Sequence, residues 1–170
     1  MRPNTASWFI WAYGSVLEAW SYVAMSGDWV KSLLPVACSA ACVGTFLLML
    51  RNGRAGRLHS WEWACVAFDV ASIFVWWWWG SALWAHLVMQ ASVPVSFAPL
   101  LAAVARDPAR ETPLPWAMWS AAYVLGFATV VLRWDGWPEA VYSANYLVWT
   151  AAVWTLCWFR RQRTPELGDA

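Results

Sequence analysis

Three ionisable side chains, Glu18, Asp69 and His86, interrupt otherwise apolar stretches of this sequence. In a bilayer interior such groups cost roughly 2.5–3.5 kcal/mol each on insertion scales, so they normally face protein or water. Glu18 lies about 16 Å into its stretch at ~1.5 Å per helical residue, which is close to the middle of a bilayer. It is either a protonated, hydrogen-bonded packing residue or a site for a proton or another cation. Asp69 lies only about two helical turns into its stretch, and we expect a structural role in which it reaches the inner headgroups or pairs with an arginine of the "RNGRAGR" loop.

His86, Gln90 and Pro94 follow one another at four-residue intervals and so share one face of a helix. Proline has no N–H to give to the carbonyl four residues back, so the Gln90 carbonyl loses its helical partner. A freed carbonyl at membrane depth is tolerated where it faces protein or a water-filled cavity. One histidine alone makes neither a zinc site nor a haem site, so His86 is either a buried structural residue or part of a polar site.

The last apolar stretch carries a second polar face. Tyr142, Asn145, Tyr146 and Trp149 lie three or four residues apart and therefore share one side of a helix. Tyrosine and tryptophan rings stack on flat solutes, while asparagine supplies donors and an acceptor. The alternative is that these side chains only form hydrogen bonds between helices.

These groups lie at similar depths, since three helices bring them toward the middle of the bilayer from its two sides. We therefore predict an outward-facing polar pocket with Glu18 as its floor. Its predicted lining residues are His86, Gln90, Tyr142, Asn145 and Trp149.

The elements that position these residues are predicted from composition. The chain has 170 residues, of which 61% are hydrophobic and only 12% charged, against roughly 25% charged in soluble domains. Six apolar stretches approach the ~20 residues that span a bilayer. They cover residues 7–25, 32–50, 63–79, 82–105, 116–132 and 140–159. We expect an all-α polytopic membrane protein in which residues 1–170 form a single transmembrane domain.

The cations divide unequally between the two ends of these six stretches. One side holds nine of the 11 cations, and the other holds only Lys31 and Arg133. The nine are Arg2, Arg51, Arg54, Arg57, Arg106, Arg110, Arg160, Arg161 and Arg163. The positive-inside rule then places both termini in the cytoplasm and the chain in the inner membrane.

Tryptophan is unusually frequent, with 18 residues, and many lie at the ends of the apolar stretches. Four are consecutive, from Trp76 to Trp79, and would point in every direction around a helix. Indoles favour the headgroup zone, so we interpret this run as an anchor in the outer aromatic belt.

The first and last apolar hairpins resemble each other. Trp8, Trp11 and Trp29 recur 108 residues later as Trp116, Trp119 and Trp137, and the matching turns read "SGDW" and "WDGW". Both hairpins start inside, which predicts a parallel repeat related by an axis along the membrane normal, a plan found among transporters.

The segment from Val93 to Phe127 resembles the PQ-loop group, which includes the SWEET and SemiSWEET sugar facilitators. The similar features are Pro94 and Pro99 near the end of one helix, a short basic loop, and a next helix that opens with Trp116 and Trp119. The whole chain resembles a SWEET that lacks its first helix. The resemblance implies a gating role for the prolines and a pocket role for Asn145. Neither proline is followed by glutamine, and Ala37 occupies the position that a symmetric partner of Asn145 would take.

Two classes of function remain. The first is a transporter or facilitator of a small polar solute, and the second is a non-transporting membrane subunit whose Trp-rich surface binds partner chains, a pigment or a quinone. The sequence shows no nucleophile pattern, metal set, phosphate loop or nucleic-acid patch, so we expect no enzyme activity, no cofactor, no bound metal and no nucleic-acid partner. The expected partners are the lipid bilayer, a small polar solute, and a second copy of the chain or partner membrane subunits.

Overall fold

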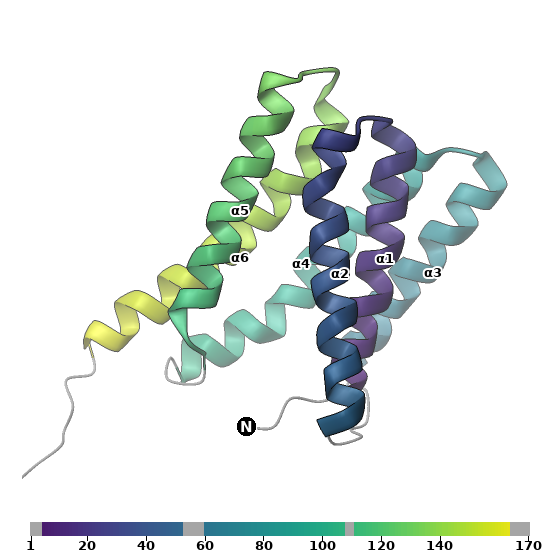
Figure 1. The fold of residues 1–170 in the computed structure, drawn as a ribbon. Helices are drawn as coiled ribbons and strands as arrows, with labels where there is room; N and C mark the ends of the chain where they lie inside the picture. The colour runs from purple at the N-terminus through teal and green to yellow at the C-terminus, as the bar shows by residue number, and fades with distance from the viewer. Residues whose placement is uncertain (1–4, 53–59, 108–110, 164–170) are drawn as a thin grey trace, which may run out of the picture.

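A computed structural model describes residues 5–52, 60–107 and 111–163 of the chain. These residues form six α-helices and no strand, so the all-α prediction is confirmed (Figure 1). The helices are α1 (Thr5–Ser26), α2 (Trp29–Asn52), α3 (Ser60–Trp79), α4 (Ala82–Arg106), α5 (Pro113–Leu132) and α6 (Trp137–Arg163).

Four helices, α2, α3, α5 and α6, begin three residues before the apolar stretches that predicted them. At two of these starts, a proline lies in the first turn. α5 starts at Pro113 and α6 at Trp137, immediately before Pro138. The first N–H groups of a helix have no intrahelical partner, so proline fits there without loss. The prolines that ended the predicted loops therefore belong to the first turns of the helices.

Short turns join the helices into three hairpins. Gly27 and Gly80 adopt left-handed backbone angles, φ 65° and 62°, and their N–H groups donate to Val23 (3.0 Å) and Trp76 (2.7 Å). This is the left-handed C-cap that glycine forms without steric cost. Asp28, just before α2, caps the first turn of that helix, because its Oδ1 accepts the N–H of Val30 at 2.8 Å. All three turns lie at one end of the bundle (Figure 1).

The three hairpins pack side by side with α4 in the middle. α4 contacts α3 within its own hairpin and also contacts α1 and α6. α1 further contacts α3, and α2 contacts α5. This places α1, α4 and α6, which carry the predicted site, against one another.

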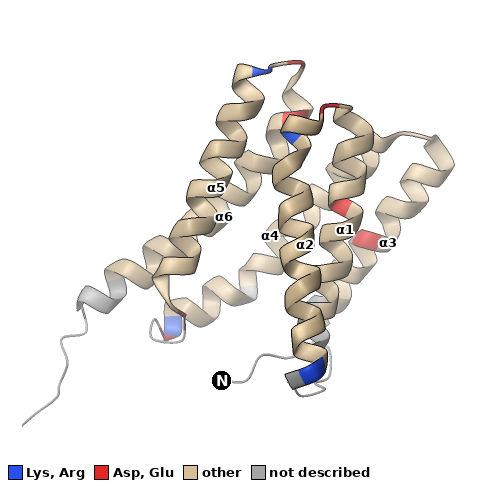
Figure 2. Cartoon of the chain, viewed as in Figure 1, with Lys and Arg blue, Asp and Glu red and all other residues tan. Residues whose placement is uncertain are grey.

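Charged and apolar side chains are distributed as expected for a helical bundle that is surrounded by lipid. Within the described residues, the charged side chains distant from the helix ends are Glu18 and Asp69, and both are buried. The exposed charged side chains gather at the two ends of the bundle (Figure 2). Large apolar side chains are exposed on every helix, among them Trp20, Leu48, Phe74, Trp84, Leu125 and Trp158. A water-soluble bundle would show the opposite pattern.

Three helices are long and apolar enough to cross a bilayer, namely α2, α4 and α5, which indicates a membrane protein. The apolar part of α3, Trp63–Trp79, is shorter. In α1 and α6, polar side chains such as Glu18 and Asn145 interrupt the apolar sequence. They lie inside the bundle rather than on its surface. Their lower hydropathy therefore does not reflect a polar outer face.

The four consecutive tryptophans occupy the last turn of α3. Trp77, Trp78 and Trp79 are exposed, whereas Trp76 packs edge-on against Trp20 of α1, with ring centroids 5.9 Å apart. One indole thus fixes α3 to α1, and the other three cover the outside of the bundle at the end that holds the turns.

Candidate functional site

Glu18 is the centre of a buried hydrogen-bond network between three helices. Its side chain is 4% exposed. One carboxylate oxygen accepts the amide N–H of Gln90 from α4. The other accepts the hydroxyl of Tyr146 from α6 at 2.7 Å. The carboxyl group thus joins α1, α4 and α6 at about half the length of α1.

Asn145 extends this network along α6. Its Nδ2 donates to the backbone oxygen and to the side-chain Oε1 of Gln90, both at 2.9 Å. Its Oδ1 accepts the indole N–H of Trp149 at 3.0 Å. The backbone oxygen that Asn145 takes is the one that Pro94 leaves without a helical partner. Asn145 of α6 therefore supplies the hydrogen bond that Pro94 of α4 cannot give to the Gln90 carbonyl.

His86 lies one turn from Gln90 on α4, between α1 and α6. Its ring packs against Tyr22 and Tyr142, with centroids 5.4 and 6.4 Å away, and its Nδ1 lies 3.4 Å from Ser21 Oγ. Because the Ser21 hydroxyl donates to the Glu18 backbone oxygen at 2.9 Å, we assign the proton of a neutral His86 to Nδ1. Nε2 then carries a lone pair, and it has no partner among the described residues although the side chain is 0% exposed.

Aromatic rings enclose these polar groups. Tyr146 stacks on Tyr123 of α5 at 5.0 Å and contacts Tyr142 at 5.1 Å. Tyr142 in turn contacts Tyr22 at 5.5 Å. Toward the end of the bundle opposite the turns, Trp149 stacks on Phe97 at 6.4 Å, beside a core cluster that includes Val104 and Cys157. Aromatic packing therefore closes this side of the hydrogen-bond network.

The structure thus brings the six predicted lining residues together between α1, α4 and α6. His86 and Tyr142 contact each other and join the other four through Tyr146. Tyr146, Ser21 and Tyr22 belong to the same site but were not among the predicted lining residues. Their helical spacing from Asn145 and Glu18 was the available signal. Tyr123, on α5, gave no such signal.

Asp69 is buried where α3 meets α1, one helical turn along α1 from Glu18. A Cβ on Gly14 would lie 3.1 Å from Asp69 Oδ2, so the carboxyl group packs directly on the glycine backbone. The expected partner arginines, in the "RNGRAGR" loop, fall mostly outside the described residues, and so do any contacts that they make. Pro99 lies within α4, and its side chain is likewise outside the described set.

We expect Gly14→Ala to lower the melting temperature of the detergent-solubilised protein, because the added methyl group would push Asp69 away from α1. Gly44→Ala is a matched control, since Gly44 is also helical and a Cβ there meets nothing within 4 Å. That control should be neutral or stabilising, because alanine is the better helix former by about 1 kcal/mol. Equal melting temperatures for the two variants would mean that the close approach of Asp69 is absent.

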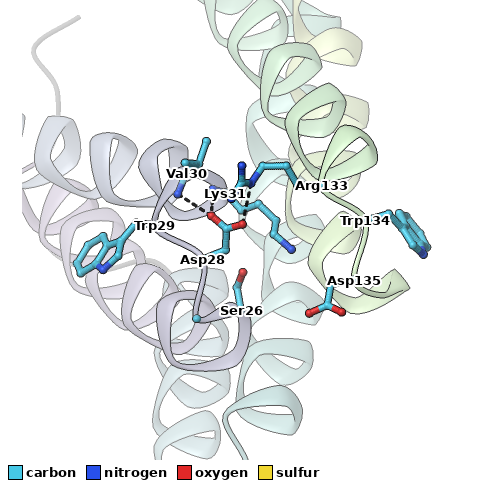
Figure 3. A pocket seen from close by; sticks show the side chains of 9 residues that line it. Ser26, Asp28, Trp29, Val30, Lys31, Arg133, Trp134 and Asp135 are labelled. Atoms are coloured by element: carbon cyan, nitrogen blue, oxygen red, sulfur yellow. Dashed lines mark hydrogen bonds and ion pairs between the residues drawn. The ribbon is translucent and has the colours of Figure 1, made fainter.

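A cavity of about 780 Å³ opens at the end of the bundle that holds the turns. The α1–α2 and α5–α6 turns form it, and Figure 3 shows its lining side chains. Arg133 donates to Asp28 at 2.8 Å across it. The lining residues are Ser26, Gly27, Asp28, Trp29, Val30, Lys31, Arg133, Trp134 and Asp135. None of the six predicted pocket residues is among them.

A buried ion pair lies between this cavity and the Glu18 network. Lys31 of α2 pairs with Glu139 of α6, and both side chains are less than 10% exposed. The Tyr22 hydroxyl donates to the Glu139 backbone oxygen at 3.2 Å. Polar groups therefore continue from the cavity through Lys31–Glu139 and Tyr22 to His86 and Glu18.

The outer pair, Asp28–Arg133, is open to solvent. The hydrogen bond from Arg133 is the main reason that the pKa of Asp28 lies below its ordinary value of 3.8, and the backbone N–H groups of Val30 and Lys31 lower it further. A lowered pKa means that the pair contributes above that ordinary value and is lost as the pH falls below it. The pair is therefore intact at neutral pH.

No group of three or more His, Cys, Asp or Glu side chains in the described part of the chain is placed to hold a metal ion. Comparison with known proteins gives no match to a protein-family model, a curated protein or a solved structure. The function is therefore inferred from the site itself.

Proposed function

We propose that this protein is a transporter or facilitator of a small polar solute, with its binding site at Glu18, Gln90 and Asn145. The observation that carries the proposal is the network that links these side chains between α1, α4 and α6. Polar groups in a membrane interior are costly, and they commonly mark solute or ion pathways. A single interhelical hydrogen bond would be enough to pack two helices, whereas here a carboxyl group, two amides, a phenol and an indole meet at one level.

The structure corresponds to a closed state in this proposal. The polar side chains bond to one another, and the Lys31–Glu139 pair separates them from the outer cavity. Both ion pairs, Lys31–Glu139 and Asp28–Arg133, tie the first hairpin to the last at their outer ends. Their separation would admit a solute from the cavity, so the two pairs serve as the outer gate. The element that moves is α4, a continuous helix in which Pro94 leaves the Gln90 carbonyl without its helical hydrogen bond.

We further propose that the first and last hairpins are parallel repeats, as in the PQ-loop group. Helices α5 and α6 begin 108 residues after α1 and α2, and the paired Lys31 and Glu139 are also 108 residues apart. Corresponding residues meet in this way close to a two-fold axis. The repeat is functionally asymmetric, since Gly126 corresponds to Glu18 and Ala37 to Asn145. Each hairpin thus contributes different polar groups to one site.

The proposed topology has six spans, with both termini in the cytoplasm of a cell whose inner membrane holds the protein. Reporter fusions at Gly53 and at the C-terminal end should read cytoplasmic, and a fusion at Gly80 should read external. The cation distribution motivates this expectation. A reversed reading at any of the three positions would contradict the six-span topology.

Solute flux into proteoliposomes tests the proposed function. Purified protein should accelerate uptake of at least one class in a panel of radiolabelled polar solutes that includes glucose, choline and amino acids. Asn145→Ala and Glu18→Gln should abolish that uptake, while Thr155→Ala, on the exposed face of α6, should retain it. Uptake that no site variant affects would refute the proposal.

The second candidate is a membrane subunit that does not transport. The observation in its favour is the exposed tryptophan run of α3, at the edge of the bundle, which could pack on a partner chain, a pigment or a quinone. Under this candidate, Trp77→Ala with Trp78→Ala should abolish co-purification of a defined partner or pigment. Under the transporter proposal these changes should leave flux intact.

A further inference from the structure

The interior of the bundle has more negative than positive side chains. Each Lys or Arg side chain that the structure describes lies near an end of the bundle, and Lys31, the buried one, pairs with Glu139. Among the described residues, Glu18 has no cationic partner. A carboxyl group in this environment needs a proton or another cation to be stable. The charge that the site lacks is therefore positive.

Tyrosine rings lie beside Glu18, the group that would bind that charge, and a cation that displaced the Tyr146 hydroxyl would meet them. Tyr22, Tyr142 and Tyr146 contact one another in series beside Glu18, at centroid distances of 5.5 and 5.1 Å. Tyrosine rings attract a desolvated cation through their π-faces, and several rings together form the cage that binds ammonium groups. A carboxylate within such a cage recognises an organic cation better than it recognises a neutral polyol.

His86 supplies an independent sign of a missing ligand. Its Nε2 is fully buried and without a partner among the described residues, whereas its Nδ1 faces Ser21. A buried acceptor that lacks a donor is destabilising. His86 lies one helical turn, roughly 5 Å, from Gln90. A ligand at Glu18 that carries a hydroxyl or N–H group a few atoms away would supply the donor.

From this arrangement we infer that the solute is a small organic cation that also carries a hydrogen-bond donor, such as an ammonium alcohol. The inference rests on the proposed function and specifies its substrate class. The ammonium group would replace Gln90 and Tyr146 as the partner of the Glu18 carboxylate, and the donor group would bond to His86 Nε2. Gln90 would keep its two hydrogen bonds from Asn145.

The test compares two probes that differ only in charge. Choline and its neutral carbon isostere, 3,3-dimethyl-1-butanol, have the same shape and the same hydroxyl group. Titration calorimetry on the full chain in lipid nanodiscs should show choline binding roughly tenfold tighter or more, since only the cation gains the carboxylate and the π-faces. This comparison uses the unaltered protein, so it does not depend on how any variant folds.

Variants then locate the site. Glu18→Gln should weaken choline binding roughly tenfold or more and leave the isostere unaffected. Tyr146→Phe should retain choline binding, because the ring face remains, whereas Tyr146→Leu should lose it. Asp107→Asn lies at the end of the bundle away from the turns and changes the net charge by the same amount as Glu18→Gln. It should have no effect on choline binding.

Equal affinity for choline and its isostere, no binding of choline, or binding that survives Glu18→Gln would overturn this inference. Uptake of glucose that depends on Asn145, without choline binding, would overturn it and leave the proposed transport function standing. Failure of the proposed function would instead appear as the absence of flux for every solute in the panel.

Discussion

Lys31→Ala should lower the free energy of unfolding by about 3–5 kcal/mol, because it leaves the Glu139 carboxylate buried without its partner. Both side chains are almost fully enclosed at the junction of α2 and α6. The change should appear as a large drop in the temperature at which the protein loses its monodisperse peak in detergent. Glu139→Gln should have a similar effect.

The apolar double variant Lys31→Met with Glu139→Leu is the critical control. It removes both charges together and should restore most of the stability, since a buried ion pair is often replaceable by apolar side chains. Arg133→Ala should have a much smaller effect, because the Arg133 side chain is half exposed in its pair with Asp28. A loss for Arg133→Ala as large as that for Lys31→Ala would contradict this assignment of the two pairs.

Asn145→Ala should also be strongly destabilising. It removes the partner of the Gln90 backbone oxygen, the Gln90 side-chain oxygen and the Trp149 indole N–H. Buried groups without partners cost about 1–3 kcal/mol each, although local rearrangement recovers part of this. Thermal unfolding in detergent would measure the sum.

Pro94→Ala tests the part of that effect that comes from the Gln90 backbone oxygen. Alanine at position 94 has an N–H that can donate to the Gln90 carbonyl, so Asn145→Ala should cost roughly 1–2 kcal/mol less in the Pro94→Ala background. Strictly additive losses would mean that the carbonyl freed by Pro94 does not depend on Asn145.

The sequence predicted the helices well because each apolar stretch is long and bounded by glycine, proline or charge. The starts of α2, α3, α5 and α6 were predicted three residues too late. At α5 and α6 the reason is that proline both ends loops and begins helices, and the sequence alone does not separate these roles. Within the described residues, three helices are long and apolar enough to cross a membrane. α1 and α6 are less apolar because the polar side chains that build the site lie on them.

The site residues that the sequence predicted are polar side chains that recur along one face of an apolar helix. Glu18, His86, Gln90 and Asn145 each stand out as polar in an apolar surrounding, and Pro94 identified the carbonyl that Asn145 takes. The Lys31–Glu139 pair was not predicted, because both residues border short turns and resemble ordinary surface charges in the sequence. Their contact depends on how the first and last hairpins pack, which local spacing does not reveal. Tyr123 was missed for the same reason.

The access of water to the site distinguishes a transporter from a merely packed core, and it requires no knowledge of the substrate. Ser21 is 1% exposed and lies beside His86 and Glu18. In a variant whose four native cysteines are replaced by serine or alanine, Ser21→Cys should react with a membrane-impermeant methanethiosulfonate reagent, because the site opens to water during transport. Val153→Cys, buried in the core cluster with Phe97 and Val104, is the matched control and should stay unreactive. A thiol at position 21 that reacts no faster than the one at position 153 would contradict the transporter account.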